Sequence, residues 1–203
     1  MNSSFQNSGT VVGMGRPREF AEDRAVDAAM RAFWRAGYEA TSTQDLCAAT
    51  GLGRSSIYNT FHSKRTLFEQ ALGRYMTART DSAVALLERA APIREKLREL
   101  LWETVEPPAD DPVGCLVVNS LVELASRDEE IGAALARDQS RRHEALRAAL
   151  ESAGRGGELS ATAEPTALAH FLMATISGMR VMARGGADAA TLASVAETAL
   201  AAI

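Results

Sequence analysis

Apolar residues recur at helical spacing along almost the whole chain, and no stretch alternates as a half-buried strand does. The clearest example lies near the start of the chain. There the apolar positions follow steps of three and four residues: Val26, Ala29, Met30, Phe33 and Trp34. Such spacing places these side chains on one face of a helix. The sequence therefore predicts an all-α protein.

Glycines, prolines and capping residues divide the chain into about nine expected helices. One is a short helix that ends just before Gly51. The other eight are expected at residues 21–36, 54–61, 64–88, 92–105, 113–126, 128–153, 164–184 and 188–202. The helix at 113–126 is apolar on nearly every side, so we expect it to be buried. Residues 1–15 have neither a basic start nor a long apolar centre, so we expect a disordered arm rather than a signal peptide.

Charge is unevenly distributed, although the net charge of −4 alone does not suggest a nucleic-acid partner. Residues 1–80 carry ten Lys and Arg against seven Asp and Glu, whereas residues 81–203 carry twelve against nineteen. This asymmetry indicates that the N-terminal part faces an anion. The two cysteines, Cys47 and Cys115, form no CxxC pattern, and the expected location is a reducing cytoplasm, without a membrane partner.

Residues 42–61, which include most of the stretch "GLGRSSIYNTFHSK" (51–64), supply the three parts of a helix-turn-helix: a first helix, a tight turn with glycine and a second helix. If Ile57 points inward, Phe61 does too, and the outward side chains can hydrogen-bond to bases or phosphates. The candidate DNA contacts from this region are Thr43, Arg54, Ser55, Ser56, Tyr58, Asn59, His62 and Lys64. Asn59 can pair with adenine, and Lys64 can hold a phosphate as a point charge. A solvated helix face with an ordinary turn is the alternative interpretation.

Upstream, "GRPR" adds Arg16 and Arg18 to the candidate DNA contacts. Pro17 between them favours an extended arm that enters a minor groove, unless the segment is only a basic tail.

The segment "TSTQDLCAATGLGRSSIYNTFHSKRTLFEQAL" resembles the DNA-binding part of the TetR family of bacterial regulators, and "GRPREFAEDRAVDAAMRAFWRAGYEAT" is similar to its first helix and basic arm. The resemblance implies a three-helix DNA-binding domain at 16–64, an effector-binding and dimerisation domain at 65–203, and a homodimer that represses transcription from a palindromic operator. It also implies that the last two helices form the dimer interface. Gly53, Ser55 and His62 depart from the family pattern, which affects the choice of operator.

The second half of the chain offers no GxSxG, P-loop or HExxH motif, and its histidines lack metal-ligand spacing. We therefore expect neither an enzyme nor a cofactor or metal. The candidate effector-binding residues are Trp102, Cys115, Asn119, Glu123, Phe171 and Met179, and each has core packing or an internal partner as its alternative role.

Cys115 is a special case because the helix N-terminus favours a thiolate there. The stretch "GCLVVNSLVELA" also resembles a TetR-type subgroup that includes regulators of electrophile defence, which implies a sensor thiol. A small buried apolar residue is the alternative. For the whole chain, the competing function is a helical adaptor that does not bind DNA.

Overall fold

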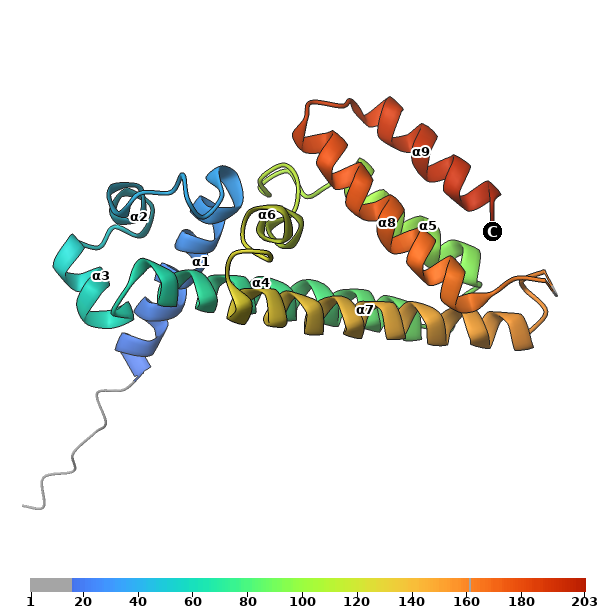
Figure 1. Cartoon of the computed structure of the whole chain (residues 1–203), viewed down its shortest axis with the longest axis horizontal. Helices are drawn as coiled ribbons and strands as arrows, with labels where there is room; N and C mark the ends of the chain where they lie inside the picture. Colours follow the sequence, from blue (N-terminus) through green and yellow to red (C-terminus); the bar gives the residue numbers. More distant parts are fainter. Residues whose placement is uncertain (1–15, 161) are drawn as a thin grey trace, which may run out of the picture.

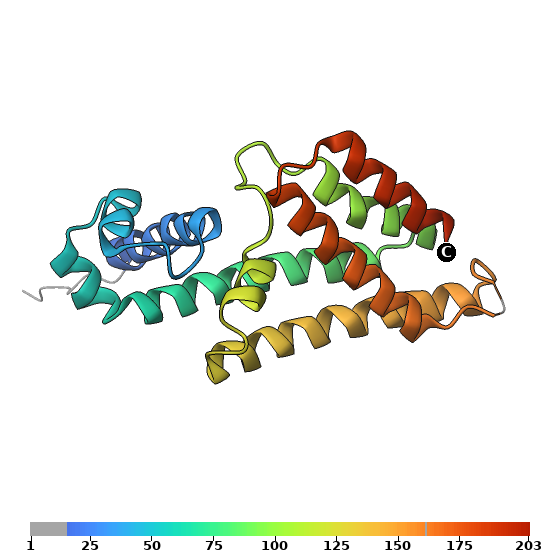
Figure 2. The ribbon, with the colours of Figure 1, turned by 45° about the horizontal axis from the view of Figure 1, so that its top comes forward.

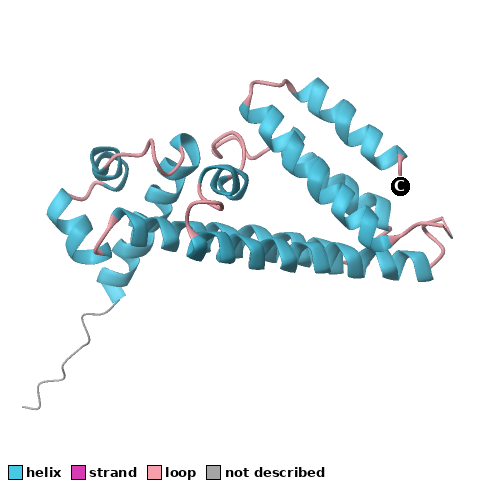
Figure 3. Ribbon diagram, viewed as in Figure 1, coloured by secondary structure: helices cyan, strands magenta, loops and turns pink. Residues whose placement is uncertain are grey.

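The structure is a computed structural model that describes residues 16–160 and 162–203, and every regular element in these two ranges is a helix (Figure 3). The helices are α1 (Arg16–Ala36), α2 (Thr43–Thr50), α3 (Arg54–Phe61), α4 (Lys64–Glu88), α5 (Ile93–Val105), α6 (Leu116–Glu123), α7 (Glu129–Arg155), α8 (Pro165–Arg184) and α9 (Ala189–Ala201). The predicted all-α class is confirmed. The arm expected at 1–15 lies outside the described residues.

Two helices, α1 and α6, differ most from their predicted bounds. α1 begins at Arg16 rather than at residue 21, because Pro17 is tolerated in a first helical turn, where its missing N–H has no partner to lose. α6 is shorter than the predicted helix at 113–126. Gly114 has a φ of +94°, so the helix starts only after it, with Cys115 as the N-cap.

Local capping fixes the ends of α2 and α4. Ser42 caps α2 in a reciprocal box, because its hydroxyl accepts from the N–H of Asp45 while the Asp45 carboxylate accepts from the N–H of Ser42. Gly51 ends α2 in the left-handed conformation, with a φ of 69°. Ser63 caps α4 by accepting from the N–H of Thr66. These caps define a short turn on either side of α3.

The helices form two regions, which we call the head (α1–α3) and the body (α5–α9), with α4 running through both (Figure 1). The head core packs Phe33, Leu46 and Phe61 against Leu67 and Phe68 of α4, all of them 2% exposed or less. The first turns of α4 therefore belong to the head core, and its later turns to the body.

In the body, α4 and α7 lie side by side, and α8 crosses them to pack against α7 and α9 (Figures 1 and 2). A second core, which includes Leu97, Leu101, Leu150, Leu172 and Leu200, holds α5, α7, α8 and α9 together. α6 lies between the regions and packs against α1, α4, α7 and α8. Its position makes it a direct connection between head and body.

Candidate DNA interface and regulatory pocket

The outer face of α3 is open and uncharged except for Arg54. Ile57 and Phe61 anchor the helix with 1% and 2% exposure, as the inward direction predicted. The opposite side exposes the polar residues Arg54, Ser55, Ser56, Tyr58, Asn59 and His62. The helix projects at the end of the head (Figure 1). A helix anchored in this way presents hydrogen-bonding groups outward, as readout of base edges in a major groove requires.

Tyr58 and Thr43 connect α3 to the start of α2. Their hydroxyl oxygens are 3.5 Å apart, and the Arg54 guanidinium carbon lies 5.9 Å from the centre of the Tyr58 ring. Thr43 is half-buried, and Tyr58 is 38% exposed. These contacts hold three of the predicted DNA-binding side chains on one surface.

His62 occupies a strained position after α3. Its φ is +65°, in a region that residues other than glycine rarely adopt. Its backbone N–H donates to the carbonyl of Tyr58, and Ser63 then begins the cap of α4. The imidazole is exposed at this sharp turn. The turn fixes the angle between α3 and α4, so it also fixes how α3 projects from the molecule.

Lys64 is held against the head by Tyr38, a residue that the sequence analysis did not select. The Lys64 ammonium lies 4.4 Å from the centre of the Tyr38 ring, and its Nζ is 3.4 Å from the carbonyl oxygen of Glu39. The Tyr38 ring itself packs on Phe68 at 4.8 Å. An aromatic residue directly after Gly37 is the sequence signal that could have pointed to Tyr38 as a neighbour of this site. A cation oriented in this way is suited to a phosphate beside the α3 groove.

Arg16 and Arg18 lie in the first turns of α1. The prediction of an extended arm at these two residues is therefore wrong, since their backbone is helical.

The six predicted effector residues do not meet in one cavity. Met179 is fully buried in the body core, Phe171 is 42% exposed, and Trp102 is half-buried beneath the Arg98 guanidinium at 4.9 Å. Cys115 is 1% exposed. The remaining two, Asn119 and Glu123, contact the head.

α6 and α8 hold the end of α1 through side chains. Glu123 accepts from the backbone N–H groups of Tyr38, at 2.9 Å, and Glu39, at 2.7 Å. The Asn119 side-chain amide donates to the carbonyl of Trp34 at 3.3 Å, and Arg184 donates to the same carbonyl at 3.2 Å. The last carbonyls of a helix have no partner within it, so these donors from the body act as its C-terminal cap.

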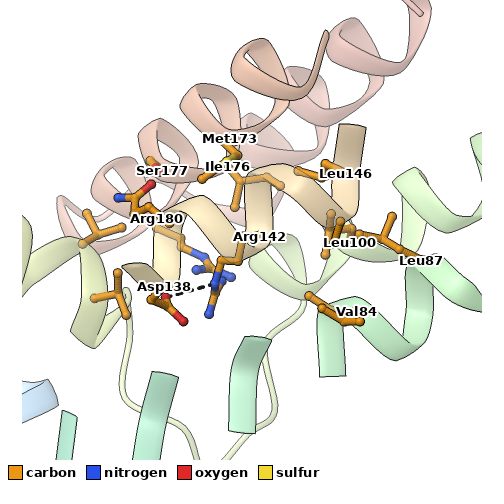
Figure 4. A pocket seen from close by; sticks show the side chains of 15 residues that line it. Val84, Leu87, Leu100, Asp138, Arg142, Leu146, Met173, Ile176, Ser177 and Arg180 are labelled. Carbon is orange, nitrogen blue, oxygen red and sulfur yellow. Dashed lines mark ion pairs between the residues drawn. The ribbon is translucent and has the colours of Figure 1, made fainter. Parts of the chain in front are cut away.

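A pocket opens in the body between α4, α7 and α8, with α5 and α6 completing its wall (Figure 4). Figure 4 shows Asp138, Arg142 and Arg180 at one end and Leu87, Leu100 and Leu146 toward the other. A mostly apolar hollow with a few polar groups is typical of a small-molecule site.

Cys115 does not line the pocket but contacts Arg180, which does. Arg180 Nη1 is 3.2 Å from the Cys115 Sγ, and the Tyr75 hydroxyl donates to the same sulfur at 3.5 Å. Burial raises the pKa of the Cys115 thiol, but the Arg180 charge, the Tyr75 hydroxyl and the N–H of Val118 together hold that pKa below its ordinary value. The largest lowering contribution comes from Arg180 on α8, and the N–H of Val118 in the first turn of α6 adds a smaller one.

Comparison with known proteins agrees with the fold. Residues 25–71 match the family described as bacterial regulatory proteins, tetR family, and residues 94–199 match the tetracyclin repressor-like C-terminal domain. The HTH-type transcriptional repressor ComR of Escherichia coli (strain K12) is 32% identical over 92% of this chain and 90% of its own length. The HTH-type regulator YezE of Bacillus subtilis (strain 168) is 30% identical over 86% of this chain and 92% of its own.

Among solved structures, a cysteine mutant of the TetR family regulator CifR, complexed with 26-base-pair operator DNA, superposes with a TM-score of 0.78. It is 30% identical, and the match covers 96% of this chain and 99% of that one. The fold and the α3 surface define a helix-turn-helix regulator. The chain belongs to the TetR family of bacterial regulatory proteins, so it is a DNA-binding transcriptional regulator rather than an enzyme or a helical adaptor.

Proposed function

We propose that the chain is a homodimeric repressor in the cytoplasm that binds a palindromic operator through α3 of each protomer and leaves it when an effector binds the body. The exposed polar face of α3 carries this proposal. Relatives named as transcriptional repressors, and a neighbour complexed with operator DNA, support it.

On the DNA, Ser55 and Asn59 are suited to base edges, because both are exposed on the outward side of α3. Arg54 begins the helix, where the free N–H groups also favour a phosphate. Lys64 supplies the second phosphate contact. Residues 16–64 would form the DNA-binding domain and residues 65–203 the domain for effector and dimer, with α4 continuous between them.

The dimer would form through α8 and α9. α8 exposes an apolar row at helical spacing, with Phe171 at 42%, Val181 at 53% and Met182 at 38% exposure. α8 contains an 18-residue stretch with a mean hydropathy of 1.2, so by length and composition alone it could cross a membrane. Only 22% of this stretch is buried in the single chain. A second copy that covers this face accounts for its composition. The small residues Ala174 and Gly178, exposed on the same face, let two helices approach closely.

Dimerisation also has a reason on the DNA side. One short recognition helix makes few contacts, whereas two helices about 34 Å apart read a two-fold symmetric site. The spacing between the two heads then decides whether both can bind at once.

The signal from the body to the head has a direct path. Arg180 lines the pocket, and Arg184, one turn further along α8, holds the carbonyls at the end of α1. α6 likewise lines the pocket with Val117 and contacts the head through Asn119. An effector that prefers a different position of α6 or α8 would shift the head, and DNA release follows from that difference in affinity.

An electrophile that modifies Cys115 is a second candidate effector, favoured by the lowered pKa of this thiol. Cys115 is 1% exposed and lines neither the pocket nor the neighbouring hollow between α1 and α5, so the reagent would reach it only when Arg180 moves.

Mobility shift with DNA from upstream of its own coding region tests the proposal. The wild-type protein should form a complex that survives excess unrelated DNA and should reduce transcription in vitro. A variant with Ser55, Asn59 and Lys64 all replaced by Ala should lose the complex, whereas Arg141→Gln on α7 should keep it. A complex that the triple variant retains would contradict the proposal.

A further inference from the structure

The pocket between α4, α7 and α8 has a charged end and an apolar end, and this asymmetry constrains what it can hold. The apolar end is formed by Leu87, Leu100 and Leu146, while the charged end carries Arg142 and Arg180 beside Asp138 (Figure 4). The side chain of Asp138 is 7% exposed and that of Arg142 is 17% exposed. The ligand therefore meets groups largely removed from water.

Asp138 and Arg142 already neutralise each other. The Arg142 Nε is 3.3 Å from Asp138 Oδ2 and 2.8 Å from the Thr80 hydroxyl. That hydroxyl donates to the other carboxylate oxygen of Asp138 at 2.6 Å. Thr80 is fully buried, so this three-residue network is rigid. Two atoms of this network, the Arg142 Nη2 and the Asp138 Oδ2, are buried and have no hydrogen-bond partner among the described residues.

Arg180 is the second cation at the charged end of the pocket. Among the residues whose side chains the structure describes, no Asp or Glu oxygen lies within ion-pair distance of it, and its hydrogen-bond acceptor is the Cys115 sulfur. Glu103 acts on Arg180 only at longer range, from the hollow on the other side. While the Cys115 thiol is protonated, the half-buried Arg180 guanidinium has no anion from the described part of the chain at hydrogen-bond distance, and a bound anion relieves the cost of leaving that charge unpaired.

We propose that this pocket binds a small amphipathic monocarboxylate, with its carboxylate on Arg180 and Arg142 and its hydrocarbon part among the leucines. A carboxylate is planar and has two acceptor oxygens, so it can accept from both guanidinium groups. An ammonium head is disfavoured, because the two guanidinium groups of Arg142 and Arg180 outnumber the one carboxylate of Asp138 at this end of the pocket. This inference rests on the proposed function, because it names the chemistry of the effector.

The ligand would also act at the right place. A carboxylate that accepts from the Arg180 guanidinium competes with the contact between Arg180 and Cys115. Arg180 lies on α8, the helix that also holds the end of α1 through Arg184. α4 contributes Val84 and Leu87 to the same wall and carries Leu67 into the head core. Binding can thus move α8 relative to α4.

Calorimetric titration of the full chain with octanoate, octanamide and octylamine tests the proposal. These probes share a tail length and differ in the head group. Octanoate should bind at least about tenfold more tightly than octanamide, and octylamine should bind more weakly than both. Arg180→Gln and Arg142→Gln should each remove the preference for the acid, whereas Arg141→Gln, on the exposed side of α7, should keep it.

Arg180→Lys provides a second variant in case the glutamine variants do not fold, since it retains the charge and should retain the preference for octanoate over octanamide. Equal binding of acid and amide, or no binding of octanoate at millimolar concentration, overturns the inference. Operator binding by the ligand-free protein is measured in parallel. If that binding is intact while octanoate fails, the inference alone falls; if octanoate binds selectively but the operator is not bound, the proposed function falls.

Discussion

The Glu123 carboxylate accepts a hydrogen bond from the backbone N–H of Tyr38 at 2.9 Å, across the boundary between body and head. Its second oxygen accepts from the N–H of Glu39 at 2.7 Å. One side chain of α6 therefore holds the turn that follows α1. Because Tyr38 in turn supports the Lys64 ammonium, the same contact links α6 to a predicted phosphate-binding group.

Glu123→Gln should weaken this connection. The glutamine keeps one acceptor oxygen but points an amide donor at the other N–H, so a charge-assisted hydrogen bond is lost. We expect the free energy of unfolding in urea to fall by about 1–3 kcal/mol. Glu88→Gln removes the same charge from an exposed position near the end of α4 and should leave stability unchanged. Equal effects of the two variants would show that the contact does not stabilise the protein.

Gly37→Ala should be more harmful than Gly51→Ala. Both glycines have a positive φ, which costs an alanine about 1–2 kcal/mol. A Cβ at Gly37 would also lie 2.9 Å from the Glu123 Oε2, whereas a Cβ at Gly51 meets nothing within 4 Å. In a Glu123→Ala background the extra cost at Gly37 should disappear, as measured by a double-mutant cycle in urea. If Gly37→Ala costs as much in the Glu123→Ala background as in the wild type, the extra cost comes from the backbone conformation alone.

The exposed polar face of α3 was predictable from the sequence because it depends on local signals. Gly51, the inward positions of Ile57 and Phe61, and the polar residues between them all lie within a few helical turns, so spacing alone orients the face. The role of Glu123 was not predictable in the same way. A carboxylate in an apolar helix indicates only that a partner exists, and here the partner is backbone N–H some 84 and 85 residues away.

The pocket was missed for the same reason. Asp138 and Arg142 lie one turn apart on α7, whereas Arg180 looks like an ordinary charged helix position in the sequence, and only the crossing of α7 and α8 brings it beside them. Large apolar residues such as Met179 were the candidates for the pocket lining, yet Met179 is fully buried in the body core.

Lys64→Ala and Asn59→Ala should affect DNA binding differently. The alanine at 64 removes a phosphate contact, so affinity should fall on every sequence, and the dependence of log affinity on log salt should decrease by about one. The alanine at 59 should instead relax selectivity at one base pair and cost about 1–3 kcal/mol on the best site. Binding to a panel of single-base operator variants at several salt concentrations separates the two. If both variants lose affinity with unchanged selectivity, the assigned roles are wrong.

The reactivity of Cys115 should depend on Arg180. Because the guanidinium charge helps to lower the pKa of the thiol, Arg180→Gln should raise that pKa and shift the pH profile of iodoacetamide modification to higher pH. The midpoint of the profile is the quantity to compare, since the variant also changes access to the sulfur. A Cys47→Ser background leaves one thiol, and Arg141→Gln is the charge-matched control. If the midpoint of the pH profile is the same in Arg180→Gln as in the wild type, Arg180 does not lower the pKa of the Cys115 thiol.

Val181→Glu should convert the protein to a monomer. The side chain is 53% exposed in the single chain, and a carboxylate there would be buried without a partner in an α8–α9 interface. Light scattering after gel filtration gives the mass, and Thr77→Glu, exposed on α4, is the control. A dimer that survives the α8 substitution would place the interface elsewhere.

Hydroxyl-radical footprinting of the ligand-free protein on its selected operator tests the central claim most directly. Two heads held by one dimer should protect two patches on the same face of the duplex, with centres about 34 Å apart. Protection at both patches should disappear together in Val181→Glu. A single protected patch, or two patches that the monomeric variant protects equally well, would contradict the account.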